Sequence, residues 1–257
     1  MPSDRAIRLF DEFTGLVREF ASRNKITPDE YHSVMAFVIS LGEAGEWPLF
    51  LDAFFESTID TINYGTGEWT SSAVLGPYYK EGAPLVADRP ALLPMRPDEP
   101  GQPMQFSSTI RDRDGNPVPG AVADIWHASN DGIYSFYNPR MPDTYLLRGK
   151  VESDENGAMD FRSIRPVPYE IPKDGPVGHL MNEVLGQHSY RPAHLHFLIT
   201  APGFQKLVTQ IYFEDDPYLT TDCCSAVKND LVVPVSKAEI DGESYHLVKF
   251  DFTLQPQ

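Results

Sequence analysis

The first quarter of the chain carries hydrophobic residues at three- and four-residue steps. Over residues 7–20 these positions line one face of a helix. A second helix is predicted after Thr27, which can cap it, because Pro28 suits the first helical position and Glu30 completes a capping box. A similar apolar spacing predicts a third helix from about residue 46 to near Gly65.

After about residue 66 the pattern changes to short runs of β-branched and aromatic residues. Asp-Gly and Asn-Gly pairs separate these runs, as is typical of turns between strands. Seven strands are predicted, at Met104–Ile110, Ala121–His127, Leu147–Val151, Met159–Ile164, His194–Thr200, Leu207–Phe213 and Tyr245–Phe252. This spacing predicts a mostly β fold, an antiparallel β-sandwich with an N-terminal α-helical region.

Composition excludes several classes of partner. The chain has 257 residues and a formal net charge of -16. It has no run of Lys and Arg to follow a phosphate backbone, so we expect no nucleic-acid partner. No apolar stretch is long enough to span a membrane, and no signal peptide is evident. The two cysteines, Cys223 and Cys224, are adjacent, which disfavours a disulfide and predicts a reducing, cytoplasmic location.

The strongest candidate for chemistry is a pair of histidines. His194 and His196 stand two positions apart on a predicted strand, so their side chains point to the same face. Neutral imidazoles bind iron, zinc, copper and nickel. A His-x-His pair is also compatible with packing or surface roles, so spacing alone leaves metal binding open.

Tyrosines are the second candidates, because a phenolate is a hard anionic ligand suited to ferric iron. Tyr134 and Tyr169 lie at predicted strand ends or in loops. The chain has 12 tyrosines, and most loop tyrosines are packing residues, so spacing does not select these two.

Several short motifs together resemble the intradiol ring-cleaving dioxygenase family. They are Leu75-Gly76-Pro77-Tyr78-Tyr79, Gly115-Asn116-Pro117-Val118-Pro119-Gly120-Ala121, Asp124-Ile125-Trp126-His127-Ala128, Gly132-Ile133-Tyr134-Ser135, Arg191-Pro192-Ala193-His194-Leu195-His196 and Thr209-Gln210-Ile211-Tyr212. The resemblance covers nearly the whole chain. The order of the motifs is specific, although each motif alone is not.

The resemblance implies one Fe(III) per subunit with four protein ligands. Tyr134 and His194 match the family's equatorial pair, and Tyr169 and His196 match the axial pair. It also implies that Arg191 and Gln210 lie near the substrate. Tyr169 would accept one proton of the substrate.

The reaction implied is cleavage of a catechol by O₂, between the two hydroxyl-bearing carbons, to a cis,cis-muconate. The stretches 146–149, 164–176 and 225–228 are most similar to actinobacterial chlorocatechol 1,2-dioxygenases, and hydroxyquinol or plain catechol remains an alternative substrate. By the same resemblance, five residues are expected to line the ring pocket: Val74, Pro77, Tyr78, Cys223 and Cys224.

These expectations define three regions. Residues 1–65 form a helical region expected to make a homodimer, as the family does, often with a bound lipid. Residues 66–103 form a Pro-rich linker that contributes to the substrate pocket, and residues 104–257 form the β-sandwich Fe(III) domain.

Two other classes remain as alternatives. The segment 115–121 also occurs in transthyretin-like sandwich modules, which bind without catalysis. Cupin-like Fe(II) or Mn(II) enzymes also use His-x-His, but they need a nearby Glu and a later His. Here the next carboxylate after His196 is Glu214 and the one later histidine is His246, which fits poorly.

Overall fold

The computed structural model describes residues 3–64 and 67–257. The chain divides into two units, Met1–Trp47 and Pro48–Gln257. Each unit is considered separately below.

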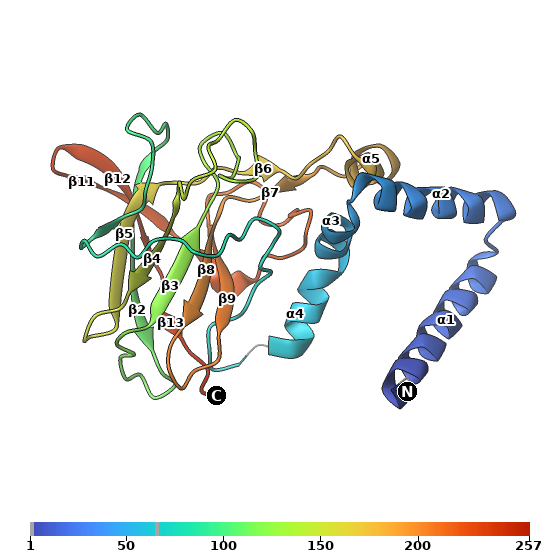
Figure 1. Cartoon of the computed structure of the whole chain (residues 1–257), viewed down its shortest axis with the longest axis horizontal. Coiled ribbons are helices and arrows are strands. Elements are labelled where there is room, and N and C mark those ends of the chain that lie inside the picture. The colour runs from blue at the N-terminus through green and yellow to red at the C-terminus, as the bar shows by residue number, and fades with distance from the viewer. Residues whose placement is uncertain (1–2, 65–66) are drawn as a thin grey trace. The chain divides into compact units, whose positions relative to one another are not determined.

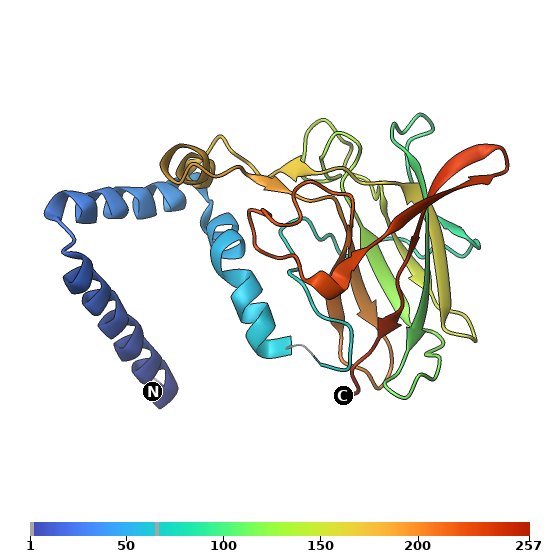
Figure 2. The same ribbon diagram turned by 180° about the vertical axis from the view of Figure 1, so that it is seen from behind.

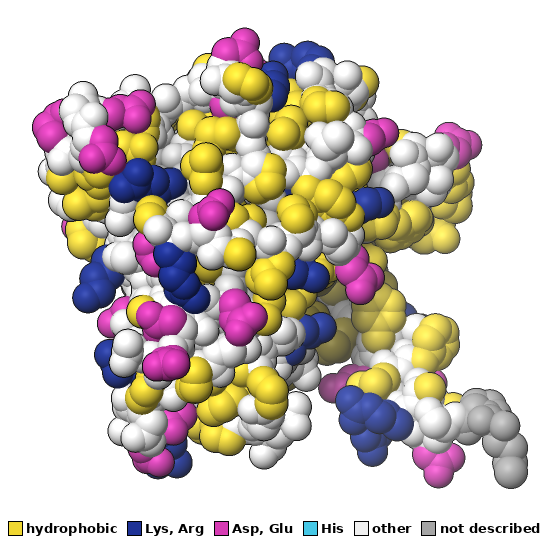
Figure 3. Space-filling model, turned by 60° about the vertical axis from the view of Figure 1, so that its left-hand side comes forward, with side chains coloured by type: hydrophobic (Ala, Val, Ile, Leu, Met, Phe, Trp, Pro, Cys, Tyr) yellow, Lys and Arg dark blue, Asp and Glu magenta, His cyan; other side chains and the backbone are white. Residues whose placement is uncertain are grey.

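The first unit is made of two capped helices, α1 (Asp4–Asn24) and α2 (Pro28–Ala44). The Ser3 side chain caps α1, and Thr27 and Glu30 form the capping box predicted for α2. None of the α1 side chains is buried, and its hydrophobic residues lie along its surface in Figure 3. No helix in the described part of the chain is long and apolar enough to cross a membrane.

The third predicted helix is present as three consecutive pieces. They are α3 (Trp47–Leu51), a π-helical turn (Asp52–Glu56) and α4 (Ser57–Tyr64). The end predicted near Gly65 lies outside the described residues. The π-helical turn was not predicted, because hydrophobic spacing does not distinguish it from an α-helix.

Two sheets form the second unit (Figures 1 and 2). The first sheet contains β1 (Ala91–Leu92), β5 (Ala158–Ile164), β2 (Pro103–Arg111), β12 (Glu243–Lys249), β11 (Val235–Ile240) and β13 (Phe252–Thr253). The second runs in the order β10 (Val232–Val233), β9 (Leu207–Phe213), β8 (His194–Thr200), β3 (Val122–Trp126), β4 (Arg148–Glu152). A separate short ribbon pairs β6 (Tyr169–Glu170) with β7 (Tyr190–Arg191), and α5 (Pro176–His179) lies between its strands in the sequence.

The sequence prediction of the fold is confirmed in part. All seven predicted strands are present, the last of them divided into β12 and β13. Both sheets are mixed rather than antiparallel, because β12 and β13 pair with β2 in parallel and β10 pairs with β9 in parallel. The description "mostly β" holds only for the second unit, since helices make up a share of the described chain comparable to that of strands.

One hydrophobic core joins the two sheets. Phe106 and Phe161 of the first sheet stack with ring centroids 5.2 Å apart, and Phe197 of the second lies 5.1 Å from Phe106. Along β2, buried and half-buried residues alternate, as expected for a strand with one face on a core. On β8, Leu195 and Phe197 point into this core. His194 and His196 therefore point to the opposite face, where the candidate site lies.

Candidate functional site

The two histidines of β8 are brought together as the sequence predicts. Their Nε2 atoms lie 3.0 Å apart, and both side chains are buried. The Nδ1–H of His194 donates to the Pro192 carbonyl at 2.7 Å, which makes Nε2 the nitrogen of this ring that carries a lone pair. The His196 ring stacks on Trp126, with ring centroids 4.6 Å apart, so its orientation is fixed.

The two predicted tyrosines converge on the same place from different elements. Tyr134 comes from the loop after β3, and Tyr169 from the ribbon strand β6. Their ring centroids lie 5.5 Å apart. Tyr134 lies 6.2 Å from His196, and Tyr169 lies 5.7 Å from His194, between ring centroids. The structure thus gathers all four residues into one cluster, called here the Tyr/His cluster.

Burial sets the charge state of the Tyr/His cluster. It raises the pKa of Tyr134 and that of Tyr169 well above the ordinary phenol value. It also lowers the pKa of His194 to about 3 and that of His196 well below its usual range. The imidazoles are therefore neutral at pH 7, and the phenols ionise only if a positive charge enters the cluster.

The two imidazole nitrogens of the Tyr/His cluster have the spacing of two ligands of one metal ion. Two imidazole nitrogens bound at about 2.1 Å to one ion, with a bond angle near 90°, are separated by roughly 3.0 Å, and the Nε2 atoms of His194 and His196 have this separation. The Tyr134 hydroxyl is fully buried and has no hydrogen-bond partner of normal geometry among the described residues. Such an orphaned oxygen is costly without a partner and is available as a ligand.

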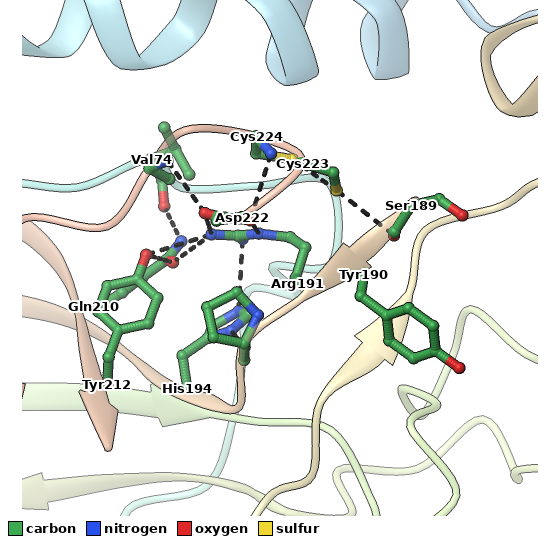
Figure 4. A network of polar contacts seen from close by, with 12 residues as sticks. Val74, Ser189, Tyr190, Arg191, His194, Gln210, Tyr212, Asp222, Cys223 and Cys224 are labelled. Carbon is green, nitrogen blue, oxygen red and sulfur yellow. Dashed lines mark hydrogen bonds and ion pairs between the residues drawn. The ribbon is translucent and has the colours of Figure 1, made fainter. Parts of the chain in front are cut away.

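A buried charge network adjoins the Tyr/His cluster (Figure 4). The Arg191 guanidinium donates to both carboxylate oxygens of Asp222, at 3.1 and 3.2 Å, and to Gln210 Oε1 at 3.0 Å. Gln210 Nε2 donates to the Val74 carbonyl at 2.5 Å, and the Tyr212 hydroxyl donates to Gln210 Oε1 at 2.6 Å. Arg191 and Gln210 were predicted to lie near the substrate. Arg191 lines the small pocket described below, and Gln210 contacts Arg191 without lining that pocket.

Asp222 was missed by the sequence reasoning. Its carboxylate pairs with Arg191, which holds its pKa below the usual value although desolvation opposes this. It also accepts the backbone N–H groups of Cys224 and Ala226. Nothing in the sequence distinguishes Asp222 from the other acidic residues, which number 37 with it, because Asp222 does not directly follow a predicted strand.

A small pocket opens beside Tyr169, Arg191 and His196. It is lined by these three and by Leu49, Asp52, Ala53, Glu56, Val74, Gly76, Pro77, Tyr78, Ile171 and Cys224. Four of the five residues predicted for the ring pocket are therefore present. Cys223 is not a lining residue, and its Sγ lies 3.9 Å from that of Cys224.

The helical face of the pocket was also missed. Leu49, Asp52, Ala53 and Glu56 recur at three- and four-residue steps, which places them on one face of the helix. Glu56 Oε1 accepts the N–H of Leu75 at 3.3 Å, while its Oε2 is buried without a partner among the described residues. The four helical residues are a mixture of polar and apolar types, so no hydrophobic pattern in the sequence indicates this face.

A second and wider cavity lies away from the Tyr/His cluster. Its volume is about 210 Å³, and Glu56, Ile59, Trp69 and Lys206 are among its lining residues. It contains none of the four residues of the Tyr/His cluster. The smaller pocket is therefore the one placed for chemistry at that cluster.

Comparison with known proteins agrees with this placement. Residues 74–256 match the Dioxygenase family, and residues 4–68 match the Catechol dioxygenase N terminus family. The chain is 60% identical over 255 residues to a chlorocatechol 1,2-dioxygenase of Rhodococcus opacus, covering 99% of each chain. It is 36% identical over 220 residues to a hydroxyquinol 1,2-dioxygenase of a Rhizobium species, covering 83% of this chain and 73% of that protein.

A solved structure shows the same fold. The crystal structure of 3-chlorocatechol 1,2-dioxygenase from Rhodococcus opacus 1CP superposes with a TM-score of 0.92 at 38% identity, covering the whole of both chains. Together with the family matches along almost the entire sequence, this identifies the chain as a member of the intradiol catechol dioxygenase family.

Proposed function

We propose that this chain cleaves a chlorocatechol or catechol between its two hydroxyl-bearing carbons and adds both atoms of O₂, giving a cis,cis-muconate. The observation that carries this proposal is the convergence of Tyr134, Tyr169, His194 and His196 beside a pocket lined by aromatic and small apolar residues. The 60% identity to the chlorocatechol 1,2-dioxygenase of Rhodococcus opacus supports the substrate class.

The four residues of the Tyr/His cluster would hold one Fe(III) per subunit. The family uses non-haem iron, and the two phenols match the preference of ferric iron for hard anionic oxygen. When bound, the ion would draw electron density from the catecholate and make the ring reactive toward O₂. The ligand roles of the four residues are part of this proposal.

The two tyrosines are not equivalent toward a substrate. Tyr169 lines the pocket, whereas Tyr134 does not. A catechol in the pocket would therefore meet Tyr169 rather than Tyr134, and Tyr169 is the residue that would accept one of the two catechol protons. It can do so only as the phenolate, which forms when a positive charge enters the cluster, because burial raises the pKa of the phenol.

Arg191 supplies positive charge at the pocket wall. Asp222 and Gln210 fix its guanidinium, and Nη1 lies 3.5 Å from His194 Nε2. A guanidinium held in this way stabilises negative charge that develops on the ring and on the adding oxygen without reorganising. Gln210 acts through Arg191, as a positioning residue.

The pocket supports a substituted ring as substrate. Ala53 and Cys224 are small and leave room for a chlorine atom, and a sulfur atom is polarisable. Hydroxyquinol and plain catechol remain the alternative substrates. A transthyretin-like binding module is disfavoured, because residues 74–256 match the dioxygenase family.

The helical unit is proposed to form a homodimer. Phe10, Phe13 and Leu16 are 66%, 63% and 60% exposed, although they are large and apolar. Residues 1–65 would provide this contact, with or without a lipid. Residues 66–103 would contribute to the pocket and 104–257 would hold the iron. Light scattering at micromolar concentration tests the dimer, and organic extraction with mass spectrometry tests the lipid.

We also propose a cytoplasmic location for this protein. Both cysteines are free thiols, which suits a reducing compartment.

The function is tested by O₂ uptake and product absorbance with a panel of catechol, 3-chlorocatechol, 4-chlorocatechol and hydroxyquinol. We expect one O₂ consumed per substrate and ultraviolet absorbance of a muconate, with the highest kcat/KM on a chlorocatechol. A yellow semialdehyde product would contradict intradiol cleavage. Preference for hydroxyquinol would select the alternative substrate.

A further inference from the structure

The adjacent cysteines lie at the edge of the pocket and take no part in the chemical steps of the proposed reaction. Both are free thiols, and Cys224 lines the pocket whereas Cys223 is half-buried beside it. Their Sγ atoms are 3.9 Å apart. The two sulfurs and a carboxylate oxygen of Asp222 all lie within 4.8 Å of one another. Two soft sulfur ligands and one hard oxygen ligand therefore lie close together.

The spacing of the two sulfurs suits one tetrahedral ion. Two thiolates bound at about 2.3 Å to a tetrahedral ion are separated by roughly 3.8 Å. The observed 3.9 Å needs almost no rearrangement. A disulfide would need the sulfurs to approach to about 2.05 Å, which adjacent cysteines rarely reach.

We propose that Asp222, Cys223 and Cys224 form a binding site for a thiophilic divalent cation, of the class of Zn²⁺ and Cd²⁺, separate from the Tyr/His cluster. Binding releases the two thiol protons and leaves a fourth position of the ion open. The soft sulfur atoms select against Mg²⁺ and Ca²⁺, which prefer oxygen ligands.

Charges of both signs act on the site. Asp52 lines the same pocket as Cys224, and Asp222 contributes a second carboxylate, which Arg191 opposes by pairing with it. Glu56 also lines the pocket, but burial raises its pKa to about 7, so it is only partly charged at neutral pH. The contact between the two thiols lowers the pKa of Cys224 and raises that of Cys223, so Cys224 is the thiol that loses the first proton.

The site has a consequence for catalysis. An ion on Cys224 narrows the pocket, and coordination by Asp222 competes with the hydrogen bonds that fix Arg191. The cation would therefore compete with the ring substrate and raise its KM. This consequence rests on the proposed function, whereas the binding of the cation does not.

The test is a titration of the iron-loaded protein with Cd²⁺, followed by the ultraviolet thiolate-to-cadmium charge-transfer absorption. We expect one Cd²⁺ per chain with this absorption. Cys223→Ser and Cys224→Ser should each weaken binding at least tenfold. Ser189→Ala is the matched control. It removes a hydroxyl that has no partner among the described residues and keeps the carbonyl that accepts the Cys223 thiol, so its Kd should equal that of the parent.

Two results would overturn the cation site: Cd²⁺ binding without the thiolate absorption, or an unchanged Kd in both cysteine variants. If Cys224→Ser does not fold, Cys223→Ser decides, since Cys223 is not a pocket residue. Binding with thiolate absorption but no rise in KM would overturn the competition with substrate and leave the cation site standing. If the protein shows the thiolate absorption with Cd²⁺ but does not cleave catechols in the absence of Cd²⁺, the proposed function is refuted and the cation site stands.

Discussion

The Nε2 atoms of His194 and His196 lie 3.0 Å apart in a buried cluster where the Tyr134 hydroxyl has no partner of normal geometry in the described part of the chain. Apart from this contact, His194 Nε2 has the Arg191 Nη1 atom at 3.5 Å. Buried polar atoms normally have partners, so this place favours an ion that the Tyr134 oxygen and both Nε2 atoms can bind.

Tyr134→Phe is expected to abolish iron binding without destabilising the iron-free protein. The oxygen that the variant loses has the Tyr169 hydroxyl as a neighbour but makes no hydrogen bond of normal geometry, so little stability should be lost. Iron content and thermal unfolding of the iron-free protein measure the two effects. Tyr79→Phe is the control. Its hydroxyl donates to Asp124 at 3.1 Å, so this variant should retain iron and lose about 1 kcal/mol of stability. Full iron content in Tyr134→Phe would contradict the ligand assignment.

Arg191→Lys is expected to lower kcat/KM by roughly 10²- to 10³-fold. Lysine keeps the charge but lacks the planar guanidinium that contacts Asp222 and Gln210 together. Steady-state kinetics on the iron-loaded variant measure this loss. The control is Arg165→Lys, because Arg165 pairs with Asp215 at the surface. If both variants keep parental kcat/KM, Arg191 has only a structural role.

Cys224→Phe is expected to reduce activity on substituted catechols more than on catechol itself. The larger ring would occupy the space beside the substrate, and crowding by a small group in a pocket changes kcat/KM by roughly 10- to 200-fold. The ratio of kcat/KM for 3-chlorocatechol and catechol measures the effect, with Cys224→Ala as the variant that leaves the space open. An equal loss on both substrates would remove Cys224 from the ring pocket.

Glu56→Gln is expected to change how stability depends on pH. Burial first, and then the nearby Asp52, raise the pKa of Glu56 from 4.5 to about 7, while Arg191 and the Leu75 N–H oppose this. The folded chain therefore binds more protons than the unfolded chain between these two values. Its free energy of unfolding should fall as pH rises from about 4.5 to about 7 and then level off.

Glutamine does not titrate, so the difference in unfolding free energy between parent and Glu56→Gln isolates this contribution. The parent should be favoured relative to the variant more strongly at pH 5 than at pH 8. Urea unfolding at the two pH values measures it. Asp160→Asn, at a carboxylate on β5 that does not line the pocket, is the matched carboxylate-to-amide control. An identical difference at both pH values would show that Glu56 titrates normally.

Two of the central strands were predictable from the sequence with their bounds. β8 and β9 are each rich in large apolar, β-branched and aromatic residues, which is typical of a buried strand. β11 was not predicted, since its residues are half-buried or exposed and include Lys237 and Glu239. The parallel pairing of β2 with β12 and β13 was also unpredictable, because it joins segments far apart in the chain.

Within the site, the resemblance to the family picked out residues that the structure places together. Tyr134, Tyr169, His194 and His196 were selected by that resemblance, and the structure brings them together. Asp222 and Glu56 lie in none of the motifs that carry the resemblance. Their importance arises from burial beside Arg191 and the pocket, which only tertiary structure defines.

The visible absorption spectrum of the purified protein, with an iron assay on the same sample, tests the central claim most directly. Two tyrosinates on Fe(III) should give a strong ligand-to-metal charge-transfer band and a red-brown colour that shifts when a catechol is added without oxygen. We expect this band with one iron per chain, through Tyr134 and Tyr169. A protein that stays colourless after iron loading would contradict phenolate ligation and, with it, the proposed iron(III) centre.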